Sequence, residues 1–261
     1  MNRAILIPLI LLACGCASSP AGRSAGTELP VSEQAPLDTA QQRAKVHTEL
    51  GTLYYQAGNT GVAIQEAKLA LQSDAGYAPA HNLLGLIYLT LNEQGQAQAS
   101  FEQAIKLAPG DPEIANNYGL FLCQGGRERE AIDLFLSAAR NPLYKTPTRP
   151  YTNAGLCSLR MKDEKTAEDY FRRAVTADGA NVQAIYHLSN LAFRRGDLFN
   201  AKQYLGEVHT RMEPNAESLW LGLRIERKLG DRQAEAGYAS QLRRKFAGTP
   251  EHQALMQGRF E

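Results

Sequence analysis

The sequence predicts an all-α protein, mainly a superhelix of about six helix-turn-helix units. Glycine recurs at an interval of 34 residues at Gly51, Gly85 and Gly119, and weaker copies of the pattern continue to Gly222. An alanine follows 12 residues after each marker position, and in most copies a large apolar residue such as Phe101 follows four residues later. These spacings fit the 3.6-residue period of a helix. Self-similarity at such an interval is typical of a repeat protein.

The repeated pattern resembles the tetratricopeptide repeat (TPR), a helix-turn-helix unit of 34 residues. The resemblance covers residues 41–250. Small residues stand where the two helices of a unit must approach closely, and the large apolar residue fills the gap between neighbouring units. Ser189 replaces a marker glycine and Gln241 replaces an alanine, so the last two units match less well.

The first 15 residues predict a bacterial lipoprotein signal peptide. Arg3 supplies a positive charge, and residues 4–13 form an apolar run that is too short to span a bilayer. Small residues precede a cysteine directly after this run, as an acylation site requires. We predict lipidation at Cys16; Cys14 is an alternative, and an ordinary cleaved secretory signal is another.

Residues 16–40 are predicted to be the acylated N-terminus and a flexible linker, because they are rich in Ser, Pro, Ala and Gly without an apolar period. Cleavage before Cys16 removes one of the 28 basic residues and none of the 27 acidic ones. Membrane attachment of this neutral chain would therefore depend on acyl chains. Ala and Ser after Cys16 resemble the sorting signal of outer-membrane lipoproteins. We predict an outer-membrane lipid anchor that faces the periplasm.

Two segments interrupt or follow the predicted repeats. Residues 141–150 carry three prolines between the third and fourth units and should extend a turn. Because Leu143 and Tyr144 are costly to leave in water, this insertion is either a longer connection or a contact loop for a partner. Residues 251–261 are predicted to form a C-terminal tail.

Motifs for catalysis or metal binding are missing from the sequence. It holds no H-E-x-x-H, no G-x-x-x-x-G-K-[ST] and no C-x-x-C. We therefore expect no enzymatic activity, no cofactor and no small-molecule substrate. Basic and acidic residues are balanced, 28 against 27, without a basic cluster, so nucleic acid is not expected as a partner. His47 and His81 share one repeat position and are predicted to be partly buried core residues and not metal ligands.

The concave surface of a TPR superhelix, lined by the first helix of each unit, is the predicted interaction site. Four positions relative to the marker glycine, −3, +1, +4 and +5, should project there. An aliphatic stripe with Asn and Gln at its rim suits an amphipathic helix or an extended segment of a partner. The alternative is that these leucines pack against neighbouring first helices. The predicted partner-binding residues are Tyr55, Leu86, Leu89, Asn116, Leu120, Leu156 and Leu159.

Cys123 and Cys157 are predicted to form a disulfide. They are the only cysteines after the signal region, and they lie on the first helices of adjacent units. Exported proteins meet an oxidising periplasm. Two buried free thiols are the alternative.

Three stretches are more specific than the repeat pattern, which many proteins share: NNYGLFLC at 116–123, NPLY at 141–144 and NAGLCSLR at 153–160. Together with the lipoprotein signal and six repeats, they resemble the type IV pilus biogenesis lipoprotein family called PilW or PilF. The resemblance implies a pilotin, a lipoprotein that helps the pilus secretin to reach the outer membrane and to form its multimeric ring. Its implied partners are the secretin subunit and outer-membrane lipid, with no catalysis. A TPR scaffold for cell-envelope or outer-membrane protein assembly and a periplasmic enzyme with a TPR adaptor are the alternatives.

Overall fold

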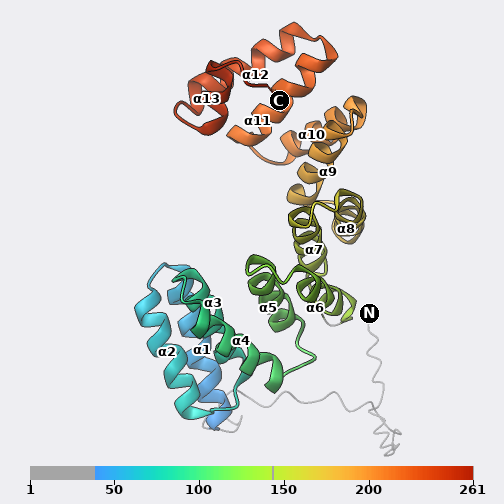
Figure 1. Cartoon of the computed structure of the whole chain (residues 1–261). Coiled ribbons are helices and arrows are strands. Elements are labelled where there is room, and N and C mark those ends of the chain that lie inside the picture. The colour runs from blue at the N-terminus through green and yellow to red at the C-terminus, as the bar shows by residue number, and fades with distance from the viewer. Residues whose placement is uncertain (1–38, 143, 261) are drawn as a thin grey trace, which may run out of the picture. The chain divides into compact units, whose positions relative to one another are not determined.

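A computed structural model describes residues 39–142 and 144–260 (Figure 1). The predicted signal peptide, both N-terminal cysteines and nearly all of the predicted linker lie outside these residues. The described residues belong to one compact unit and form thirteen α-helices and no strand. None of these helices is long and apolar enough to cross a membrane. The helices are α1 (Ala40–Gln56), α2 (Thr60–Ser73), α3 (Ala78–Thr90), α4 (Gln94–Leu107), α5 (Pro112–Gln124), α6 (Glu128–Arg140), α7 (Thr148–Arg160), α8 (Glu164–Ala177), α9 (Val182–Arg194), α10 (Leu198–Arg211), α11 (Ala216–Leu229), α12 (Arg232–Lys245) and α13 (Pro250–Met256).

The first twelve helices pack as six consecutive pairs, from α1 with α2 to α11 with α12. The predicted all-α TPR superhelix is therefore confirmed. Two boundaries differ from the sequence-based ones. α1 begins at Ala40, the last residue assigned to the linker, and the predicted tail 251–261 contains most of α13, which packs against α11 and α12.

Helix starts and turns follow local sequence chemistry. Asp163 and Asp197 precede α8 and α10, and each carboxylate accepts a hydrogen bond from the backbone N–H three residues later. This capping satisfies an N–H group that has no partner within the helix. The turn inside a pair needs a left-handed residue, which is glycine in several units but Asn92 and Lys162 in two others, both with φ of 60°.

The marker glycines allow the two helices of a pair to approach closely. A Cβ atom added at Gly155 would lie 2.6 Å from the ring of Phe171, and one at Gly85 would lie 2.7 Å from the ring of Phe101. Both rings are fully buried. In the fifth unit the marker position is Ser189, whose buried hydroxyl donates to the Ala201 carbonyl over 2.7 Å. The predicted small-residue packing is thus confirmed, and the serine satisfies its own polar group.

Candidate partner-binding site

The first helices of the first four units are neighbours, because α3 contacts both α1 and α5, and α5 contacts α7. Six predicted partner-binding side chains on these helices are half-buried. They pack on the edge of the core and keep part of their surface accessible. The sequence left two alternatives, packing against neighbouring helices and exposure to a partner, and these side chains do both. These six residues, here called the apolar stripe, are Tyr55, Leu86, Leu89, Leu120, Leu156 and Leu159.

Tyr55 stands at the seam between the first and second units. Its hydroxyl lies 2.7 Å from the Thr90 hydroxyl and donates to the Leu86 carbonyl over 3.5 Å. The Thr90 hydroxyl also donates to that carbonyl, over 3.0 Å. These contacts place the aromatic ring beside Leu86 at the α1 end of the stripe.

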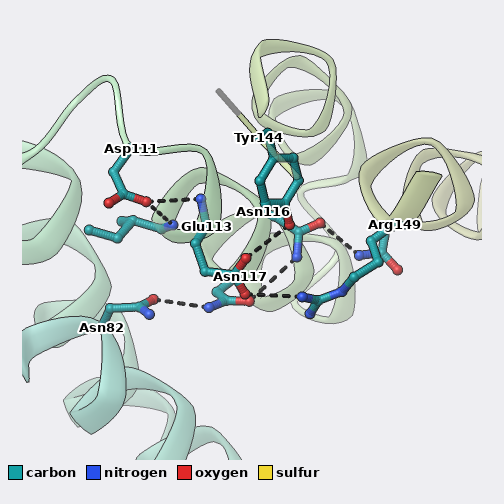
Figure 2. A network of polar contacts seen from close by, with 9 residues as sticks. Asn82, Asp111, Glu113, Asn116, Asn117, Tyr144 and Arg149 are labelled. Carbon is teal, nitrogen blue, oxygen red and sulfur yellow. Dashed lines mark hydrogen bonds and ion pairs between the residues drawn. The ribbon is translucent and has the colours of Figure 1, made fainter. Parts of the chain in front are cut away.

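Asparagine side chains link α3, α5 and α7 (Figure 2). Asn117 Nδ2 donates to Asn82 Oδ1 over 3.3 Å, Asn116 Nδ2 donates to Asn117 Oδ1 over 3.4 Å, and Asn153 Nδ2 donates to Asn116 Oδ1 over 2.9 Å. Only 1% of Asn116 is exposed. A buried amide that lost these partners would carry an unpaired polar group. The structure therefore assigns Asn116 to the link between first helices instead of the accessible face where the sequence placed it.

Sequence reasoning missed this link, although the recurrence of asparagine just before the marker glycine in units two to four was a signal for it. Asn82 and Asn116 lie three residues before their glycines, and Asn117 and Asn153 lie two before theirs. Neighbouring first helices bring these positions together, so such a column predicts an amide chain between repeats.

The proline-rich insertion is anchored to α5. The Tyr144 hydroxyl donates to Glu113 Oε2 over 3.0 Å, and Arg149 pairs with Glu113 Oε1 at 3.1 Å (Figure 2). Burial raises the pKa of the Tyr144 hydroxyl above its ordinary value. Leu143 lies outside the described residues. Tyr144 thus serves as an internal anchor, which favours the longer-connection interpretation, and α7 already begins at Thr148 within the predicted insertion.

Cys123 and Cys157 join α5 to α7. Their Cα atoms are 5.9 Å apart and their sulfur atoms are bonded. Both residues are buried. The predicted disulfide is therefore present, and it joins the third and fourth units, two of the three units that the asparagine link connects.

In the described part of the chain, His, Cys, Asp and Glu side chains form no group of three or more that could hold a metal ion. His47 Nδ1 lies 2.7 Å from Glu66 Oε2. His81 Nε2 lies 3.0 Å from the Ala75 carbonyl oxygen. Both rings are half-buried and have partners within the protein.

Comparisons with known proteins agree with this architecture. The tetratricopeptide repeat family model matches residues 78–111 and 148–181, which are the second and fourth units. The chain is 31% identical to the type IV pilus assembly protein PilF of Pseudomonas aeruginosa over 224 residues, which cover 85% of this chain and 89% of that protein.

Two solved structures are similar over most of their length. A structure of P. aeruginosa PilF aligns with a TM-score of 0.78 and 29% identity, covering 84% of this chain and 99% of that one. The crystal structure of PilW, a widely conserved type IV pilus biogenesis factor, aligns with a TM-score of 0.75 and 32% identity, covering 82% and 98%. The resemblance first indicated by the three sequence stretches is thus confirmed: the chain belongs to the PilF/PilW family of TPR proteins of type IV pilus biogenesis.

Proposed function

We propose that this protein is a pilotin, an outer-membrane lipoprotein that binds the type IV pilus secretin and promotes its localisation and multimerisation. Family membership and the capacity of TPR proteins for binding protein partners support this proposal. The apolar stripe carries it: six half-buried aliphatic and aromatic side chains follow one another along four neighbouring first helices. Such a surface fits an amphipathic or extended segment of a partner.

The stripe is tested by introducing a charge at its centre and at its far end. Leu89→Glu and Leu159→Glu are expected to keep the helical circular-dichroism signal and to abolish secretin multimers and twitching motility, because a carboxylate would lose hydration on docking of an apolar segment. Secretin multimers in membrane extracts are the readout. Leu69→Glu on α2 and Leu107→Glu on α4 are matched controls, since both leucines are 39% exposed and lie on second helices.

Normal secretin assembly in both stripe variants would contradict this site. Loss of assembly in the control variants as well would indicate a general sensitivity to surface charge and not a site on the first helices. A reduced helical signal would be followed with the milder variants Leu89→Gln and Leu159→Gln.

The membrane anchor is a separate part of the proposal and is tested at Cys16. Cys16→Ala is expected to release the protein from the outer-membrane fraction into the soluble periplasm, because a mature chain with balanced charges has no second membrane signal. Fractionation with an acyl-label assay measures this, and Cys14→Ala is the matched control. Retention of Cys16→Ala in the membrane with its acyl label, together with release of Cys14→Ala, would move the anchor to Cys14.

A further inference from the structure

Far from the stripe, the end of the chain folds back onto the last TPR unit. Phe260, four residues after α13, stacks on Trp220 of α11, with ring centroids 5.6 Å apart and an interplanar angle of 25°. The Arg227 guanidinium carbon lies 3.9 Å from the centroid of the Phe260 ring. The ring of Phe260 is therefore held between an aromatic face and a cation, a geometry that favours aromatic side chains.

Two more cations lie on α11. Arg224 Cζ lies 4.8 Å from the ring centroid of Phe193 on α9 and 5.9 Å from that of Trp220, and Lys228 Nζ lies 4.8 Å from the Phe193 centroid. We call Phe193, Trp220, Arg224, Arg227 and Lys228 the α11 cluster.

The α11 cluster contains three cations, and Glu217 and Glu251 lie close enough to Tyr186 to affect its pKa, as Arg224 does. Arg227 pairs with Glu235 at 2.7 Å, whereas Arg224 and Lys228 have no carboxylate partner among the described residues. Arg224 Nε is buried without a hydrogen-bond partner, and burial lowers the pKa of this guanidinium below its ordinary value, opposed by Tyr186. An anion brought to this place would supply the missing partner and offset the lost hydration.

Phe260 lies beside an open cavity. A cavity of about 500 Å³ adjoins its ring, lined by Trp220, Ala254, Gly258, Arg259 and Phe260 itself. Only the short helix α13 precedes this segment, and Phe260 is half-buried. A half-buried ring beside a cavity can exchange with another aromatic group that makes the same contacts with Trp220 and Arg227.

We propose that the α11 cluster is a second protein-binding surface, which accepts an aromatic side chain flanked by acidic residues from a partner protein. Phe260 occupies this surface within the same chain and competes with the partner. We infer an aromatic side chain in the ligand because Phe260 packs on Trp220 and Arg227. We infer acidic residues because Arg224 and Lys228 have no carboxylate partner among the described residues. This inference does not rest on secretin binding by the apolar stripe.

The test uses the full mature chain and the fluorescein-labelled peptide Gly-Asp-Phe-Glu-Gly, with fluorescence anisotropy as the readout. Phe260→Ala is expected to bind this peptide roughly tenfold more tightly than the unmodified chain, because the competing ring is gone. Adding Arg224→Gln to Phe260→Ala should weaken binding roughly tenfold, as expected for the loss of one charge-assisted contact. Arg243→Gln, an equal charge change on the exposed last turn of α12, is the matched control and should have no effect.

Two further peptides separate the aromatic and acidic requirements. Replacement of the peptide's Phe by Ala, or of its Asp and Glu by Lys, should each abolish measurable binding. The proposal would be overturned if Phe260→Ala and the unmodified chain bound the peptide with equal affinity, or if adding Arg224→Gln to Phe260→Ala left the affinity unchanged. Tight binding of the Lys-substituted peptide would also overturn it. Circular dichroism verifies folding, and Lys228→Gln, at an exposed position, makes the same charge test if Arg224→Gln disturbs the fold.

Discussion

Replacing Phe171 with alanine is expected to lower the free energy of unfolding by about 3–5 kcal/mol, because it leaves a cavity in a fully buried place. The Phe171 ring is 0% exposed, and it stacks on His187 of the next unit with centroids 4.9 Å apart. It therefore contributes to packing both within its own unit and between units. Urea denaturation followed by circular dichroism measures the effect. Phe199→Ala, with a ring that is 69% exposed, is the matched control and should change stability by less than about 0.5 kcal/mol.

A double-mutant cycle tests whether Gly155 and Phe171 are coupled. Gly155→Ala alone should be strongly destabilising, since its Cβ would lie 2.6 Å from the Phe171 ring. In the Phe171→Ala background the same change should cost much less, because the obstructing ring is absent. Additive effects of the two substitutions would show that the helices of this unit adjust independently of the ring, contrary to the close packing described above.

Reduction of the Cys123–Cys157 disulfide is expected to lower stability by about 3–4 kcal/mol on the chain-entropy model. The bridge spans a sequence separation of 34 residues and joins the two units on either side of the insertion. Dithiothreitol should lower the urea midpoint of the unmodified protein. The matched control, Cys123→Ser/Cys157→Ser, should start at the lower midpoint and show no response to the reductant.

Thiol counting provides an independent check of the bridge. Protein purified from the periplasm without reductant and then denatured should take up no alkylating label at Cys123 or Cys157. Quantitative labelling of both residues would show that the cysteines are free thiols in the cell, and a reductant-insensitive midpoint would agree with that result.

The sequence by itself determined the all-α repeat architecture and the close packing of small and large residues within each helix pair. Gly85, Gly155 and Phe171 could be placed because their packing depends on residues 12–16 positions apart in one helical hairpin, where local periodicity and spacing are sufficient. The order of the apolar stripe followed in the same way, since equivalent positions of neighbouring units recur at about one repeat length. The bond between Cys123 and Cys157 was a prediction with buried free thiols as its alternative, and the structure shows the bond.

Only the tertiary structure decided which polar and aromatic side chains are free and which are used inside the protein. Asn116 and Tyr144 looked suited to a partner, yet their hydrogen bonds go to Asn153 and Glu113, which lie 37 and 31 residues away in the sequence. Phe260 fell within a predicted tail, yet it stacks on Trp220. Such contacts depend on the relative placement of neighbouring units and on the path of the chain end. The recurring asparagines indicate which positions could meet, but a hydrogen bond or a ring contact forms only within a few ångströms of its partner, and the sequence pattern does not give that distance.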